Sequence, residues 1–276
     1  MKFGFNKGLT LTQKKALAIT LTLALLSDKI PIFSYISDAY TTGIHEVGHA
    51  FTGWIFGYVA IPSFDFMNGG GVTKLFSRPF LLGFVGFIFV YANLLLIKKH
   101  LNFKSNFPIG FIMLVYCIFF FSELHLSLVT FMGLGGEILF SFIIAWHALS
   151  NLMYKLSIKY TIHLFLSMVI IQHTSNFLYS LLYNPQLKSK YLEGKQQILE
   201  NNTLINDLTK LVEKTGLPLD FFSWVLIFLT ALSIYYILRI NKLPRLSGHF
   251  FKRYFTLLWN ILKEQKSQII KVIKNQ

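Results

Sequence analysis

The chain has 276 residues, of which 54% are hydrophobic and only 14% are charged, whereas an average soluble domain has about 25% charged residues. This composition excludes an ordinary soluble domain, and the 29 Phe and 13 Tyr exclude a disordered or collagen-like chain. The single cysteine, Cys117, excludes a disulfide framework and a cysteine-based zinc finger. We therefore expect an integral membrane protein.

The charge is strongly basic and unevenly distributed. Lys and Arg number 26 against 12 Asp and Glu, a formal net charge of +14. Many of the basic residues lie in 240–276, where they alternate with aromatic and aliphatic residues. This pattern is typical of a basic amphipathic helix lying among lipid headgroups, whose phosphates attract Lys and Arg. We expect membrane lipid as a partner, no nucleic acid partner, and a tail over 240–276 that is separate from a membrane domain over 1–239.

Several runs have roughly the 20 mainly apolar residues that a transmembrane helix needs. In chain order they are an interrupted first helix over 16–36 and the runs 80–97, 108–121, 124–149, 162–182 and 221–238. They predict an all-α polytopic membrane protein with about six transmembrane helices. The polar stretch 184–217 contains Leu204, Ile205, Leu208, Leu211 and Val212. This spacing predicts a short amphipathic helix in a solvated loop.

The orientation follows from Lys and Arg near helix ends, which favour the cytoplasmic side. Four lysines between Lys2 and Lys15 place the N-terminus in the cytoplasm, and the basic tail places the C-terminus there as well. The basic loops at 98–104 and 155–159 agree with this topology only if the segment 42–61 does not cross the membrane. We therefore expect a re-entrant or half-depth helix over 42–61.

The residues that carry chemistry are His45, Glu46 and His49, which form the pattern HExxH. On a helix, residues four apart share a face, so the two imidazoles can bind one zinc ion while Glu46 reaches its water as general base. Zinc lowers the pKa of that water toward 7 and polarises the carbonyl group that is attacked. Ionisable residues inside an apolar helix are costly and are functional candidates for that reason. The alternative is a helix whose histidines only hydrogen-bond to neighbouring carbonyls.

The string HEVGHA, followed by Gly53 and Gly57, resembles the first motif of the site-2 protease family of intramembrane zinc metalloproteases. The resemblance covers residues 42–73, and the Phe-Asp-Phe and Gly-Gly-Gly-Val-Thr strings in it are similar to a divergent bacterial branch of such proteins. It implies that His45 and His49 bind Zn²⁺, that Glu46 is the catalytic base, and that the protein lies in a bacterial inner membrane. The family's second motif, an Asn-Pro stretch leading to Leu-Asp-Gly, is absent.

A hydrolytic zinc site uses three protein ligands and one open position, so another residue must complete the set. Glu137 follows Gly133-Leu134-Gly135-Gly136 at membrane depth, where small residues let another helix approach closely. We expect Glu137 as the third ligand. Asp220 is the second candidate, although an Asp there also suits the first turn of a helix. Asp65, Glu123 or a further His remain, whereas Asp207 belongs to the solvated stretch.

The segment 62–73 has Phe64 and Phe66 on either side of Asp65, followed by three glycines. It predicts either a short β-hairpin or extended edge near the metal site, or a flexible connection between spans. An exposed edge would suit a protease because strand addition holds a substrate extended.

Two functions follow from these features. The first is a membrane-embedded zinc metalloprotease that hydrolyses a peptide bond in a membrane-associated protein. The alternative is a non-proteolytic membrane protein, a transporter or assembly factor, with a metal-binding or vestigial HExxH site. The intact Glu46 favours the first because a purely structural metal site has no use for a base, and the missing second motif favours the alternative. The sequence leaves the substrate and the oligomeric state open.

Overall fold

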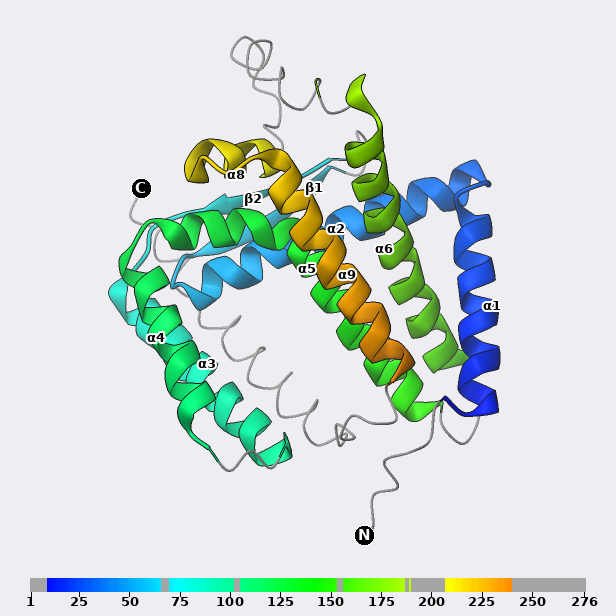
Figure 1. Ribbon diagram of the computed structural model, residues 1–276, viewed down its shortest axis with the longest axis horizontal. Helices are drawn as coiled ribbons and strands as arrows, with labels where there is room; N and C mark the ends of the chain where they lie inside the picture. The colour runs from blue at the N-terminus through cyan, green and yellow to red at the C-terminus, as the bar shows by residue number, and fades with distance from the viewer. Residues whose placement is uncertain are drawn as a thin grey trace, which may run out of the picture.

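The computed structural model describes residues 9–65, 70–101, 105–152, 156–186, 189 and 207–239. This part of the chain is mostly helical with one two-stranded sheet (Figure 1). Its elements are α1 (Leu11–Ser27), α2 (Pro31–Ile55), β1 (Ala60–Asp65), β2 (Gly70–Leu75), α3 (Phe80–Leu101), α4 (Phe107–Phe121), α5 (Leu124–Asn151), α6 (Ile158–Tyr183), α8 (Asp207–Thr215) and α9 (Leu219–Leu238). The predicted basic tail over 240–276 lies outside the described residues.

Helices α1 and α2 form a sharply bent pair. α1 begins with a capping box between Thr10 and Gln13, and the axes of α1 and α2 meet at 107° across a three-residue break. Pro31 is the first residue of α2, a position where the missing N–H costs no helical hydrogen bond. The bend lets α1 stand beside α6 while α2 crosses the molecule against α5 (Figure 1).

The crossing of α2 and α5 depends on two glycines. A methyl group on Gly48 would lie 2.1 Å from the carbonyl oxygen of Met132, and one on Gly136 would lie 2.7 Å from the Cα of Gly48. The two backbones are therefore in direct contact at the HExxH motif. This confirms the expectation that the small residues before Glu137 let another helix approach closely.

The segment after α2 forms a β-hairpin, as one of the two readings of 62–73 predicted. β1 and β2 are antiparallel, with Ala60 opposite Leu75 and Asp65 opposite Gly70. Both strands pack against α2. The hairpin thereby places β2 beside the HExxH residues.

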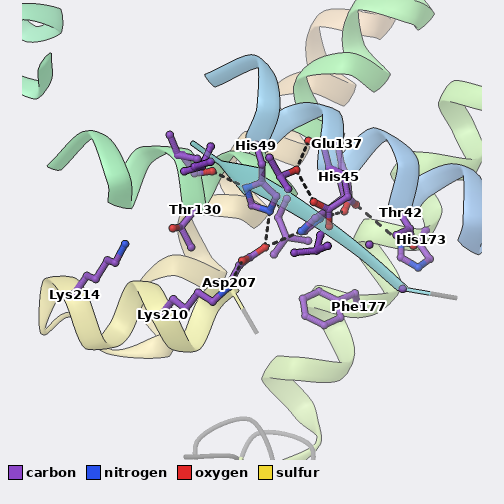
Figure 2. Close-up of a pocket in the computed structure, with 18 residues that line it drawn as sticks. Thr42, His45, His49, Thr130, Glu137, His173, Phe177, Asp207, Lys210 and Lys214 are labelled. Carbon is purple, nitrogen blue, oxygen red and sulfur yellow. Dashed lines mark hydrogen bonds and ion pairs between the residues drawn. The ribbon is translucent and has the colours of Figure 1, made fainter. Parts of the chain in front are cut away.

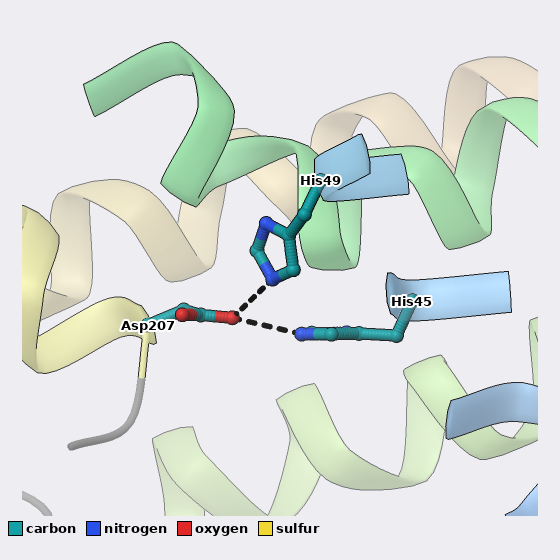
Figure 3. Close-up of side chains that lie close together, drawn as sticks. All are labelled: His45, His49 and Asp207. Carbon is teal, nitrogen blue, oxygen red and sulfur yellow. Dashed lines mark hydrogen bonds and ion pairs between the residues drawn. The ribbon is translucent and has the colours of Figure 1, made fainter. Parts of the chain in front are cut away.

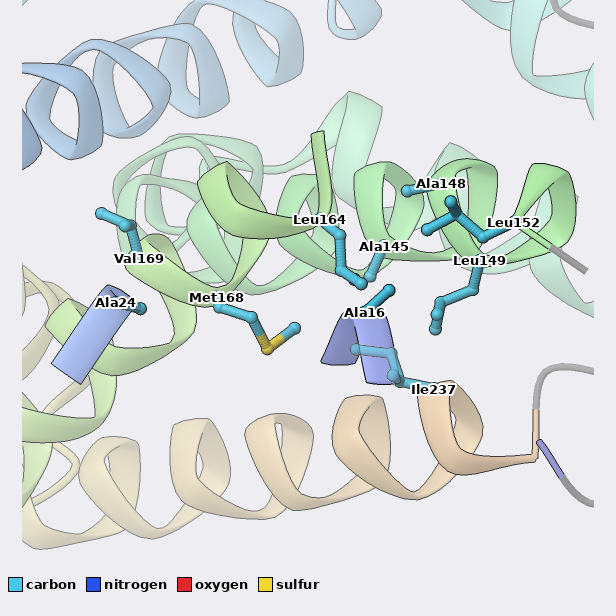
Figure 4. Close-up of a cluster of buried hydrophobic side chains, with 10 residues drawn as sticks. All are labelled: Ala16, Ala24, Ala145, Ala148, Leu149, Leu152, Leu164, Met168, Val169 and Ile237. Carbon is cyan, nitrogen blue, oxygen red and sulfur yellow. The ribbon is translucent and has the colours of Figure 1, made fainter. Parts of the chain in front are cut away.

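The described residues form three clusters of buried apolar side chains, and two of them hold α1, α6, α8 and α9 against α5. In the first, small residues such as Ala16 and Ala145 let α1, α5, α6 and α9 approach one another closely (Figure 4). Gln13 adds a buried hydrogen bond from its Nε2 to the carbonyl of Leu149 at 2.7 Å. In the second, Leu208 and Leu211 of α8 pack among residues of α5, α6 and α9. The second cluster fixes α8 against the helices that surround the site.

The prediction of about six transmembrane helices is not confirmed. Within the described ranges, two helices are long and apolar enough to cross a membrane, α5 and α9, or three if the bent pair α1 and α2 counts as one span. α4 has 15 residues and reaches only about 22 Å, short of a core of about 30 Å. The apolar part of α3, 80–95, is similarly short, and polar residues such as Gln172 and His173 interrupt α6.

Candidate metal centre

The HExxH motif lies in the C-terminal half of α2 and faces a cavity of about 680 Å³. α2, β2, α5, α6 and α8 all contribute residues to its lining (Figure 2). His45 and His49, one turn apart, have ring centroids 4.8 Å apart in an edge-to-face arrangement. Space for the rings comes from Gly133, because a methyl group there would lie 2.4 Å from His45 Nε2 and 2.6 Å from His49 Cε1.

Each imidazole is oriented through its Nδ1 atom. His45 Nδ1 lies 2.7 Å from Glu137 Oε1, and His49 Nδ1 lies 2.7 Å from the carbonyl oxygen of Val129. A carboxylate and a carbonyl group accept hydrogen bonds, so each Nδ1 carries the proton and donates it. In the neutral rings the lone pairs are then on the two Nε2 atoms, the arrangement in which histidine binds a metal ion.

Both Nε2 atoms point at Asp207 (Figure 3). Asp207 Oδ2 lies 2.8 Å from His45 Nε2 and 2.7 Å from His49 Nε2. When both Nε2 atoms carry a proton, their hydrogen bonds to Asp207 outweigh burial, which by itself raises the pKa of the carboxyl group, and hold that pKa below its ordinary value. Asp207 is also the first residue of α8, where the helix dipole stabilises a negative charge.

Two imidazole nitrogens and a carboxylate oxygen are a suitable donor set for zinc. The ligand atoms of His45, His49 and Asp207 lie within 4.8 Å of one another, so small side-chain adjustments bring them to zinc bond lengths of about 2.0–2.2 Å. Electron pairs on all three groups face the same point, and they repel one another unless a proton or a metal ion lies between them. Three protein ligands also leave the fourth position of a tetrahedral ion open.

Glu46 lines the same cavity and is 5% exposed. Thr73 Oγ1 of β2 lies 2.6 Å from Glu46 Oε2 and donates a hydrogen bond to it. Gly71 of the same strand lies against the carboxylate, and a methyl group there would be 2.6 Å from Glu46 Cγ. The hairpin therefore positions the Glu46 side chain from one side while α2 holds it from the other.

The structure brings His45, Glu46 and His49 into one cavity, and Glu137 lines it too. Glu137, however, lies beside Nδ1 of His45, on the far side of the ring from the point where the Nε2 atoms converge. Its second oxygen accepts a hydrogen bond from Thr174. Asp220 lies in the first turn of α9 and Glu123 occupies the N-cap position of α5 without a side-chain capping bond, and neither residue lines this cavity.

Asp207 is the residue that the sequence analysis missed. The structure places its side chain, 18% exposed, at the histidines rather than in solvent. A signal for it existed in the predicted amphipathic helix, because Asp207 precedes Leu211 by four residues and so shares its buried face. That face packs on α5, α6 and α9 and brings Asp207 to the site.

His125 belongs to a different part of the structure and does not line the cavity. Its Nε2 lies 2.7 Å from the hydroxyl of Tyr58, and its Nδ1 contacts the carbonyl of Ser122. It packs beside Phe56.

Comparison with known proteins identifies no relative: no protein-family model, curated protein or solved structure matches the chain.

Proposed function

We propose that this chain is a membrane-embedded zinc metalloprotease that hydrolyses a peptide bond in a membrane-associated protein or peptide. The observation that carries the proposal is the convergence of His45 Nε2, His49 Nε2 and Asp207 Oδ2, with Glu46 in the same cavity. The apolar helices and the local resemblance of residues 42–73 to site-2 proteases support the membrane setting. A bacterial inner membrane with both termini in the cytoplasm is part of the proposal.

In this proposal His45, His49 and Asp207 are the three metal ligands, so Asp207 takes the place expected of Glu137. Glu137 and the Val129 carbonyl hold the imidazole rings through Nδ1, which fixes the tautomer and raises the basicity of each ring. A zinc ion bound there supplies a water molecule with a pKa lowered toward 7 and polarises the substrate carbonyl.

Glu46 is the general base and then the general acid. Its carboxylate accepts a proton from the attacking water and later donates it to the leaving amine nitrogen. Thr73 keeps the carboxylate directed into the cavity through the 2.6 Å hydrogen bond. An intact base beside three ligands favours hydrolysis over a structural metal site, which has no need of a proton acceptor.

The hairpin gives the site a means of holding an extended chain. Among the described residues, β2 pairs only with β1, and Gly70, Gly71, Val72 and Thr73 line the cavity. Within that part of the chain the other edge of β2 is free to accept a peptide strand, whose main chain would pair with it. A peptide bond must be accessible in this extended form before it can be cut.

The test of the proposal is peptide hydrolysis by the purified full chain in lipid nanodiscs supplied with zinc, with Glu46→Gln as the matched variant. We expect the wild type to cleave members of a proteome-derived peptide mixture, identified by mass spectrometry, and Glu46→Gln to bind zinc but cleave none. Equal cleavage by the two proteins would contradict the role of Glu46. Zinc binding without any cleavage by the wild type would favour the non-proteolytic alternative, a metal-binding transporter or assembly factor.

A further inference from the structure

One of the two lysines that line the cavity has no acidic partner among the described residues. Glu46 is hydrogen-bonded to Thr73, Glu137 to His45 and Thr174, and Asp207 to the two histidines. Two lysines of α8, Lys210 and Lys214, also line the cavity (Figure 2). Lys210 Nζ lies 3.6 Å from Asp207 Oδ1, whereas Lys214 makes no ion pair with any described residue.

The charge lies on one flank of the metal centre. Figure 2 shows Lys210 and Lys214 on α8 to one side of Asp207, and His173 on α6 at the other. On that second side His173 has an acidic neighbour, because its Nε2 lies 3.7 Å from Asp38 Oδ1. Of the cavity cations that the structure describes, a bound chain would therefore meet one without an acidic partner on the α8 side only.

The distance between Asp207 and Lys214 along α8 predicts which residue of a bound substrate lies opposite Lys214. Lys214 follows Asp207 by seven residues, which is about 10.5 Å along the axis of α8. An extended peptide advances about 3.3 Å per residue. A substrate side chain opposite Lys214 is therefore about three residues from the peptide bond held at the metal centre. The length and flexibility of the lysine side chain allow a difference of about one residue in either direction.

We infer that Lys214 selects peptide substrates that carry an Asp or Glu side chain about three residues from the cleaved bond, on the side that lies along α8. The inference rests on the proposed proteolytic function. Pairing with a carboxylate would place a compensating charge where the described residues provide none. Because Lys214 is exposed at the cavity wall, the interaction is that of a partly solvated ion pair, and salt weakens it.

The experiment uses the same peptide mixture and the full chain in nanodiscs, with Lys214→Glu, Lys214→Arg and Lys74→Ala. Lys74 is a suitable control because it is an exposed lysine of β2 that does not line the cavity. We expect wild type, Lys214→Arg and Lys74→Ala to cut sites enriched in Asp and Glu two to four residues from the cleaved bond. Lys214→Glu should lose this enrichment and gain Lys and Arg at those positions.

A binding measurement separates this inference from the proposed function. The probe is a fluorescein-labelled peptide made from a cleaved sequence, with Asp or Asn at the third position, bound to the inactive Glu46→Gln protein. Fluorescence anisotropy should show the Asp peptide binding up to about fivefold more tightly than the Asn peptide, the size of one exposed ion pair. Adding Lys214→Ala should remove the difference.

Cleavage without enrichment, or enrichment that persists in Lys214→Glu, would overturn the inference while leaving the proteolytic function standing. Absence of cleavage by the wild type would overturn both. An effect of Lys214→Glu seen only in nanodiscs that contain phosphatidylglycerol, and not in phosphatidylcholine alone, would assign the lysine to lipid headgroups and also overturn the inference.

Discussion

Replacing Glu137 by Gln tests whether Glu137 positions the metal ligand His45 or binds the metal ion itself. The Glu137 carboxylate is 2% exposed, accepts the Nδ1–H of His45 at 2.7 Å, and accepts the Thr174 hydroxyl with its other oxygen. Gln has nearly the same shape and keeps one carbonyl oxygen for His45. It removes the negative charge that makes the imidazole a better donor to a cation.

The expected loss is 10- to 100-fold in zinc affinity, the usual effect of replacing a residue that supports a metal-bound histidine. This corresponds to about 1.4–2.8 kcal/mol. Competition with a chromophoric chelator measures the affinity directly, on full-length protein in detergent. Asp207→Asn should cost far more because it removes a ligand, and Glu123→Gln, which changes an acid outside the cavity, should cost nothing.

Two outcomes would refute this reasoning. If Glu137→Gln abolished zinc binding as completely as Asp207→Asn, Glu137 would itself be a ligand, as the sequence analysis expected. If Glu137→Gln left the affinity unchanged while the protein stayed folded, the contact with His45 would not support the site.

Gly48→Ala should destabilise the protein by about 1–3 kcal/mol or more, because the added methyl group meets backbone atoms at the crossing of α2 and α5. A thermal unfolding curve measures the loss of stability, and the control is Gly110→Ala, whose methyl group meets nothing within 4 Å. Gly133→Ala should lower zinc affinity because its methyl occupies the space of the two histidine rings, and unaltered affinity would argue against that packing. Thr73→Val should lower kcat about tenfold with little change in KM, because the Thr73 hydroxyl orients Glu46. Thr73→Ser keeps the hydroxyl and should retain the wild-type kcat, and a rise in KM alone in Thr73→Val would contradict this role.

The local features of the site were predictable because they depend on short spacings. The i, i+4 separation of His45 and His49 places both rings on one face of any helix, and the glycines before Glu137 allow the close crossing that the structure contains. The segment 62–73 left a hairpin and a flexible connection open, and the structure forms the hairpin. These inferences required nothing beyond the periodicity of the backbone and the size of side chains.

The identity of the carboxylate at the Nε2 atoms was not predictable in the same way. Asp207 is 158 residues from His49 in the chain, and it reaches the site only because Leu208 and Leu211 pack against distant helices. The five lysines within 184–217 indicate that this stretch is solvent-exposed on average. Such an average does not reveal that one side chain, that of Asp207, is turned toward the site. The number of spans was overestimated because the apolar runs gave helices that are too short to cross a membrane, namely α4 and the apolar part of α3.

The measurement that tests the account most directly is the zinc content of the purified full chain by elemental analysis, for the wild type beside His49→Ala, Asp207→Ala and Asp220→Ala. The account predicts one zinc ion per chain in the wild type and in Asp220→Ala, and its loss in His49→Ala and Asp207→Ala. A folded wild-type protein that holds no zinc after supplementation, or an Asp207→Ala protein that keeps its zinc in full, would contradict it.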